Sequence, residues 1–109
     1  MSTPKTSVIT QYFEADARRD IDAIVALFSD EAVVIDEDQT YHGPKEIRGW
    51  REGVASAYQY TTQVYGTQAL GEKNYLVTGR LTGNFPGGTA DLQWRFTVQG
   101  DLINRLEIE

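Results

Sequence analysis

The sequence contains no cysteine and only one histidine in 109 residues. The lack of cysteine excludes disulfides, thiolate nucleophiles and cysteine-based zinc sites. A metal ion would then depend on carboxylates, and the three acids at 36–38 are too compact to surround an ion alone. The glycine-rich stretch GNFPGGT at 83–89 lacks the lysine and the strand-to-helix context of a phosphate-binding loop. We therefore expect neither a metal nor a cofactor.

Basic residues and long apolar runs are also scarce. Sixteen acidic residues against ten lysines and arginines give a formal net charge of -6 and a pI near 4.7. Nucleic acids and anionic membranes bind basic surfaces, so we expect neither as a partner. No stretch approaches the roughly 20 apolar residues of a membrane span, and the first thirteen residues lack the pattern of a secretion signal. These features favour a cytoplasmic location.

The length and composition of the chain are typical of one globular domain, which we expect to span residues 1–109. The chain is 40% hydrophobic and 24% charged, a composition that argues against disorder. Its first half has helical periodicity around one short strand, its second half has the pattern of strands, and no linker separates them. This order predicts an α+β domain with helices on one face of an antiparallel sheet.

Two helices are expected before the first strand. Thr3-Pro4 is a typical helix start, and cations at Arg18-Arg19 suit the helix end. Asp20 is placed to cap a second helix. The apolar residues of that helix recur at helical spacing: Ile21, Ile24, Val25 and Phe28. A β-branched strand at 33–36 follows.

Gly43-Pro44 predicts the start of a third amphipathic helix over 44–57. Its apolar residues are Ile47, Trp50 and Val54. We assign Lys45, Arg48 and Arg51 to its solvated face rather than to an anion site. The remaining chain predicts four long antiparallel strands. The first begins at Tyr58 and has a bulge at Gly66, a turn follows at 71–74, and the other three span 75–83, 89–98 and 102–108.

The stretch RRDIDAIVALFSDEAVVIDEDQTYHGPKEIRGW at 18–50 carries a resemblance to a known family. It combines a short acidic cap, a helix, an acidic corner before the strand, and a glycine-proline entry to the third helix. In these features the chain resembles the NTF2-like superfamily, and within it the SnoaL-like proteins and the ketosteroid isomerases. The resemblance implies a cone in which three N-terminal helices pack in a strongly curved sheet, with element order α-α-β-α-β-β-β-β and an apolar pocket.

The resemblance also implies site residues. Asp36 matches the general-base aspartate of ketosteroid isomerases, and Tyr12 matches the tyrosine that donates a hydrogen bond to the developing oxyanion. Asp16 lies one helical turn after Tyr12 and could approach the same cavity, although a surface position is the simpler expectation. His42 is a general base by residue type, but its place before a helix start favours a loop or capping role.

One position departs from the ketosteroid isomerase pattern. Leu92 stands where those enzymes carry a second oxyanion donor, and the neighbouring Asp91 projects from the other face of the sheet. Half of the oxyanion hole is therefore absent from the aligned strand. Six residues are expected either to line the pocket or to fill the core: Phe28, Trp50, Tyr60, Leu92, Trp94 and Phe96.

The functional hypothesis is a SnoaL-like protein that binds a small hydrophobic molecule. In its most concrete form it performs isomerase- or cyclase-type acid–base chemistry on a carbonyl compound, with Asp36 as base and Tyr12 as donor. The alternatives are a pocket protein without turnover and a dimerisation module. Such cones commonly pair through the sheet, so we expect a homodimer. Residues proposed for that interface are Tyr65, Tyr75, Val77 and Leu81.

Overall fold

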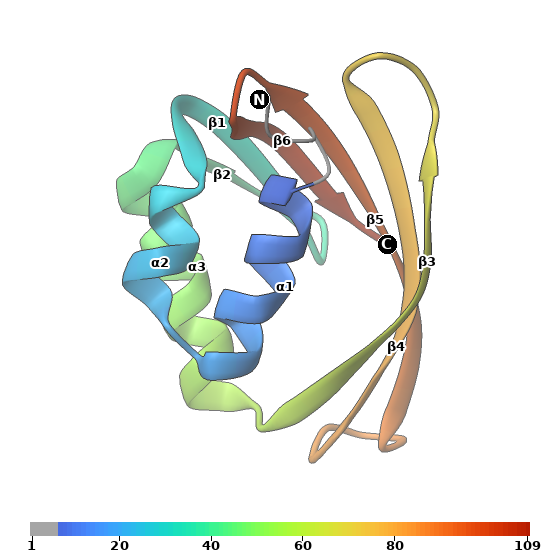
Figure 1. Ribbon diagram of the computed structural model, residues 1–109. Helices are drawn as coiled ribbons and strands as arrows, with labels where there is room; N and C mark the ends of the chain where they lie inside the picture. Colours follow the sequence, from blue (N-terminus) through green and yellow to red (C-terminus); the bar gives the residue numbers. More distant parts are fainter. Residues whose placement is uncertain (1–6) are drawn as a thin grey trace.

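A computed structural model describes residues 7–109 of the chain, without the side chain of Ala55. Three helices and six strands occur in this range (Figure 1). In chain order they are α1 Ser7–Arg18, α2 Ile21–Ala26, β1 Phe28–Asp36, β2 Gln39–His42, α3 Gly43–Ala57, β3 Tyr60–Ala69, β4 Asn74–Gly83, β5 Thr89–Gln99 and β6 Leu102–Ile108. The predicted α+β class is confirmed, with all three helices on one side of a curved sheet.

The helix boundaries follow from capping. The expected start at Thr3-Pro4 lies outside the described residues, whereas the predicted end at Arg18 is confirmed. The Asp20 carboxylate accepts a hydrogen bond from the backbone N–H of Ala23 at 3.1 Å, as expected for the N-cap of α2. Helix α2 ends sooner than its apolar period predicted, because Phe28 already belongs to β1.

The sheet has the strand order β2-β1-β6-β5-β4-β3. Strands β3 to β6 pair antiparallel as predicted, but β1 and β6 pair in parallel, so the sheet is mixed rather than antiparallel. The predicted strand at 33–36 begins earlier, at Phe28, and gains a hairpin partner in β2 that the sequence analysis did not expect. The α3 boundaries and the bulge beside Gly66 agree with the prediction.

A two-residue turn joins β1 to β2. Asp36 pairs with Gln39 across this turn, and both intervening residues, Glu37 and Asp38, have positive φ values of 53° and 65°. Positive φ at both central residues is the pattern of a type I′ turn, whose twist matches that of the flanking strands. Asp36 is therefore the last strand residue, and the next two acids form the exposed turn.

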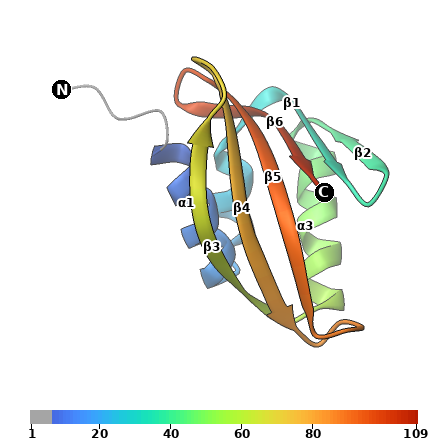
Figure 2. The same cartoon turned by 90° about the vertical axis from the view of Figure 1, so that its right-hand side faces the viewer.

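The core lies between the helices and the concave face of the sheet. Figure 2 shows β3, β4 and β5 forming an outer wall with the helices behind it. The largest fully buried side chains come from every layer: Tyr12, Phe96, Ile24, Ile47, Ile103, Leu106, Val34, Val77 and Val98. Within the described part of the chain, no helix is long and apolar enough to cross a membrane.

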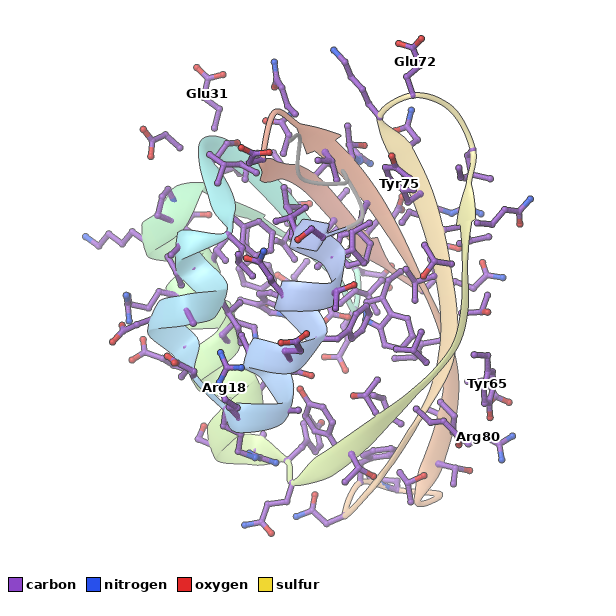
Figure 3. The ribbon with its side chains drawn as sticks, viewed as in Figure 1. Arg18, Glu31, Tyr65, Glu72, Tyr75 and Arg80 are labelled. Carbon is purple, nitrogen blue, oxygen red and sulfur yellow. The ribbon has the colours of Figure 1, made fainter. Side chains whose placement is uncertain are left out.

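The prediction that the apolar side chains of β4 face outward, into a dimer interface, is wrong. Tyr75 and Val77 are 8% and 0% exposed, and Leu81 lines a cavity, so all three point inward. The reason is the pairing register: Tyr75 lies opposite Phe96 and Val77 opposite Trp94, and directly paired residues share one face of a sheet. Figure 3 shows Tyr65 on the convex side, away from the helices, and Tyr65 is 56% exposed.

Gly79 continues the inward face of β4 where the sheet bends. A Cβ atom at this position would collide with the backbone carbonyl of Gln63 and lie 3.2 Å from the Trp94 ring. The lack of a side chain thus lets β3 approach closely and leaves room for the Trp94 ring against the sheet.

Candidate functional site

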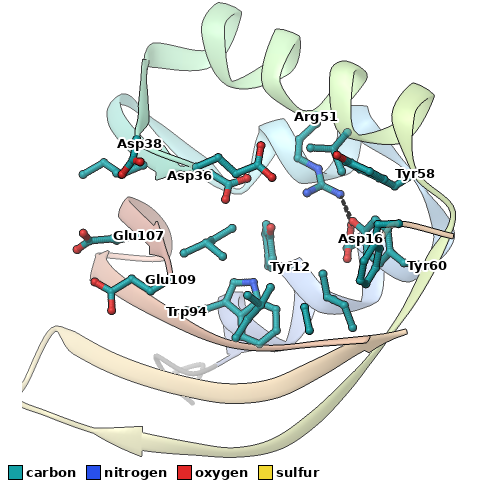
Figure 4. Close-up of a pocket in the computed structure, with 18 of the residues that line it drawn as sticks. Tyr12, Asp16, Asp36, Asp38, Arg51, Tyr58, Tyr60, Trp94, Glu107 and Glu109 are labelled. Carbon is teal, nitrogen blue, oxygen red and sulfur yellow. Dashed lines mark hydrogen bonds and ion pairs between the residues drawn. The ribbon is translucent and has the colours of Figure 1, made fainter. Parts of the chain in front are cut away.

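A cavity of about 680 Å³ lies between the helices and the sheet (Figure 4). This volume falls within the roughly 300–1,000 Å³ of small-molecule sites. Six of the ten candidate site residues line it: Tyr12, Asp16, Asp36, Tyr60, Leu92 and Trp94. The lining also includes Arg51, which the sequence analysis assigned to the solvated face of α3.

Asp36 enters the cavity from the end of β1. Its backbone is paired with Gln39 on one side and Ile108 on the other, which fixes the position of its Cα. The indole N–H of Trp50 donates a hydrogen bond to Asp36 Oδ2 at 2.9 Å. Trp50 is itself only 4% exposed and lies outside the cavity lining. It therefore holds one carboxylate oxygen from behind and leaves Oδ1 free.

Tyr12 projects from α1 toward the same cavity. Its ring is 2% exposed and makes edge-to-face contacts with Phe13, Phe28 and Phe96, at centroid distances of 5.2, 6.2 and 5.6 Å. Within residues 7–109 its hydroxyl has no hydrogen-bond partner, although the oxygen is not sealed from solvent. Burial raises the pKa of Tyr12 well above its usual range, so the hydroxyl is a proton-bearing donor.

A buried ion pair lies at one end of the cavity. Arg51 Nη2 donates to Asp16 Oδ1 and to the Tyr60 hydroxyl, the latter at 2.8 Å. The Tyr60 hydroxyl in turn donates to Asp16 Oδ1 at 2.8 Å. The side chains of Asp16 and Arg51 are each 8% exposed. Three elements, α1, α3 and β3, thus meet through one hydrogen-bonded cluster.

Arg51 stays protonated in this cluster. Burial acts to lower the pKa of the guanidinium, but Tyr12, Asp16 and Tyr60 together raise it more, and the net shift is upward. Burial also raises the pKa of Tyr60, against the opposing charge of Arg51. Arg51 is accordingly a permanent cation, and the tyrosine beside it stays neutral at ordinary pH.

The surface positions expected for Asp16 and Arg51 are wrong. The helical period itself contained the signal for Arg51, because Ile47, Trp50, Arg51 and Val54 follow the spacing i, i+3, i+4, i+7 of a buried stripe. Asp16 lies four residues after Tyr12 and so shares its face of α1. The position of Asp16 had suggested the cavity, whereas Arg51 was assigned by its charge rather than by its position on the helix.

The other residues singled out lie elsewhere. Phe28 and Phe96 are 4% and 1% exposed and belong to the core rather than to the cavity lining. His42 is exposed at the N-cap position of α3, where its side chain makes no capping bond and its backbone N–H donates to Glu46 at 2.9 Å. His42 is not among the residues that line the cavity.

Acidic residues gather at the opposite end of the cavity from Arg51, as Figure 4 shows for Asp38, Glu107 and Glu109. Glu37 belongs to the same lining. Among residues 7–109, no group of three or more histidine, cysteine or acidic side chains has the arrangement to hold a metal ion. The cavity therefore has one end with a cation and one end with acids.

Comparison with known proteins assigns the family. A family model described as a SnoaL-like domain matches residues 9–106. The chain belongs to the SnoaL-like domain family. A structure described as a candidate polyketide cyclase from Sinorhizobium meliloti is 32% identical, with 94% of each chain covered and a TM-score of 0.90. Comparison of this SnoaL-like chain with curated proteins gives no match.

More distant structures share the fold. A hypothetical protein from Catenulispora acidiphila with a ketosteroid isomerase-like fold, crystallised with trimethylamine, is 15% identical over 99% of this chain and 86% of its own, with a TM-score of 0.86. SalBIII, an epoxide hydrolase/cyclase-like enzyme with a role in pyran ring formation in salinomycin, is 18% identical over 95% and 88%, with a TM-score of 0.84. The predicted SnoaL-like relationship and cone fold are thus confirmed.

The buried ion pair generates a stability prediction. Arg51→Met leaves the Asp16 carboxylate buried without its cation, and we expect the free energy of unfolding to fall by about 3–5 kcal/mol in urea denaturation. Asp16→Asn/Arg51→Met removes both charges and loses less. Arg48→Met is the control, because the Arg48–Asp22 pair is exposed and contributes at most about 1 kcal/mol. Equal losses for the two arginine variants would contradict the burial of Arg51.

The tyrosine pKa shifts generate a second prediction, on alkaline stability. Below about pH 10, the ordinary pKa of a tyrosine, both the folded and unfolded chains keep the Tyr12 proton, so the contribution of Tyr12 to stability is constant. Above this pH only the unfolded chain ionises, and Tyr12 lowers the free energy of unfolding by about 1.4 kcal/mol per pH unit. We expect Tyr12→Phe to make the alkaline decline shallower than that of the wild type, because the variant has no hydroxyl to ionise at this position. Urea titrations across this pH range measure both slopes.

Proposed function

We propose that this SnoaL-like protein binds a small hydrophobic carbonyl compound and catalyses isomerase- or cyclase-type acid–base chemistry on it. The observation that carries the proposal is the placement of the Asp36 carboxylate and the unpartnered Tyr12 hydroxyl in one cavity. The aromatic and aliphatic parts of the lining, including Trp94 and Leu92, suit an apolar ring system. The neighbours described for polyketide and pyran ring closure support this reaction class.

The reaction uses one base and one hydrogen-bond donor. Asp36 Oδ1 takes a proton from the carbon next to the ligand carbonyl, while Trp50 holds Oδ2. The electrons of the broken C–H bond form a C=C bond, and the carbonyl π electrons move to oxygen. Tyr12 donates a hydrogen bond to that oxygen, which becomes an enolate. The protonated Asp36 then returns the proton to a carbon of the ligand, which restores both the carbonyl and the base.

Leu92 favours a second candidate function, which is ligand binding without turnover. Its side chain lines the cavity at the position where the ketosteroid isomerase pattern requires an acidic donor. An aliphatic side chain contributes to ligand affinity by burial but cannot donate to an oxyanion. The two candidates share the pocket and differ only in whether Asp36 moves a proton.

Proton exchange distinguishes these candidates. We expect the wild type to accelerate exchange of deuterium from D₂O into the carbon next to the carbonyl of 2-tetralone, a bicyclic ring ketone, followed by NMR. Asp36→Asn removes the base and lowers the rate at least about 100-fold. Asp30→Asn is the matched control, because Asp30 lies on the same strand, is exposed and does not line the cavity. Its rate stays near that of the wild type.

Binding is followed in the same samples by thermal shift. Ligand-induced stabilisation without exchange in the wild type would support the binding protein over the enzyme. Absence of both stabilisation and exchange for a panel of ring ketones, aromatic polyketide-like compounds and epoxides would overturn the small-molecule proposal and favour a dimerisation module.

We also propose a homodimer that uses the β3 edge and its convex side. Val64 and Tyr65 are 42% and 56% exposed, and β3 pairs only with β4. An exposed edge strand with large apolar side chains is a surface that proteins normally cover. We expect Tyr65→Lys to shift the sedimentation coefficient toward that of a monomer, whereas the control Thr40→Lys, on β2 at the opposite edge of the sheet, does not. A wild-type monomer at all concentrations would contradict the proposal.

A further inference from the structure

Arg51 is almost fully buried, yet within residues 7–109 only one of its three nitrogens donates a hydrogen bond. Nη2 donates to Asp16 and Tyr60. Nε is sealed from solvent and has no hydrogen-bond partner among residues 7–109. Nη1 also donates to no group in that range, but it is not sealed. Because Arg51 lines the cavity, the open donors of Nη1 face the space that a ligand would occupy.

Unpaired donors on a buried cation are unusual. A guanidinium carries five N–H donors and cannot lose its proton, so it is stabilised by acceptors at each nitrogen. A buried donor without an acceptor is destabilising unless a bound molecule completes the arrangement. Asp16 and Tyr60 satisfy one edge of the group only. Nη1 is the donor that remains accessible, and it can receive an oxygen acceptor that residues 7–109 do not provide.

Tyr12 presents a second unpartnered donor to the same region. Figure 4 shows Tyr12 between Trp94 and the Arg51–Asp16 pair, with Asp36 across the cavity. Tyr12 and Arg51 both belong to the lining of this cavity. Leu92, by contrast, contributes no polar atom to this part of the lining. Two donors, one of them cationic, therefore belong to the same cavity.

We propose that Arg51 Nη1 and the Tyr12 hydroxyl bind the same ligand oxygen, so that Arg51 supplies the second oxyanion donor that the sequence lacks at Leu92. This inference deepens the proposed function and rests on it. During proton abstraction by Asp36, negative charge moves onto the ligand oxygen, and the guanidinium stabilises that charge where it develops. Arg51 donates hydrogen bonds but transfers no proton, so the proton taken by Asp36 returns to carbon.

The charges of the cavity also restrict the substrate. The Arg51–Asp16 pair is neutral as a unit, and every other charged residue of the lining is acidic: Asp36, Glu37, Asp38, Glu107 and Glu109. A ligand with fixed negative charges would be repelled at that acidic end. The preferred substrate is thus a carbonyl compound that is uncharged when it binds and becomes anionic only during the reaction.

Substituted phenols of increasing acidity test this assignment, because a phenolate imitates the enolate oxygen. The test uses the full chain carrying Asp36→Asn, which imitates the protonated base and removes its negative charge. We expect affinity to rise with phenol acidity, and the ultraviolet spectrum to show that the bound phenol is ionised. Adding Arg51→Lys, which keeps the charge but loses the planar fork, lowers phenolate affinity about 10- to 100-fold.

Two further variants separate a binding role from a structural role. Asp16→Asn/Arg51→Met removes both charges of the buried pair, and urea denaturation checks that it folds. In this folded variant the dependence on phenol acidity should disappear. Arg48→Met, on the exposed side of α3, should leave affinity and ionisation unchanged.

Each outcome supports or overturns the inference. Phenols that bind equally well and equally ionised with and without Arg51 would overturn it, while ketone exchange by the wild type would leave the proposed function standing. Ketone exchange without any phenol binding would also overturn it. Loss of both ketone exchange and phenol binding would overturn the proposed function together with this inference.

Discussion

The buried pair of Asp16 and Arg51 is the interaction on which the geometry of the site depends. It connects α1 to α3 and, through the Tyr60 hydroxyl, connects both helices to the start of β3. A charged pair of this kind is rarely the most stabilising choice for a core, since removing two ions from water opposes their attraction. Its retention at the wall of a cavity is better explained by function than by stability.

The two side chains of the proposed reaction, Asp36 and Tyr12, are held in place by the elements around them. Asp36 lies on a strand paired on both sides, and Trp50 holds one of its oxygens. Tyr12 is held by aromatic contacts on three sides. Sites built on regular elements with supported side chains keep their geometry better than sites on loops. The acids of the turn are more exposed and adjoin this fixed centre.

Residues 18–50 contained enough signal to predict the fold. The Asp20 cap, the Gly43-Pro44 helix start and the alternation of the later strands are local features, and all of them appear in the structure. Features that depend on contacts between residues distant in sequence were harder to predict. The parallel β1–β6 pair and the inward face of Tyr75 and Val77 follow from pairing register, which no local pattern specifies.

The candidate site could also be predicted only where local patterns or the family resemblance were sufficient. Placement of Tyr12 and Asp36 followed from a family resemblance, whereas Arg51 was misread because a cation normally belongs to a solvated face. Its position four residues after Ile47 was as visible as that of any apolar residue. The missing information was its partner, Asp16, which comes from another helix and compensates the burial of the charge.

The central position of the β1–β6 pair affects how the chain reaches its native state during synthesis. Strand β1 carries Asp36, but its parallel neighbour β6 begins only at Leu102, after β3, β4 and β5 have been made. Contacts between segments so far apart in sequence slow folding, and parallel pairing adds to this delay. On the ribosome, the pairing of β1 that positions Asp36 must therefore wait for β6, and the cavity becomes complete only when that strand is in place.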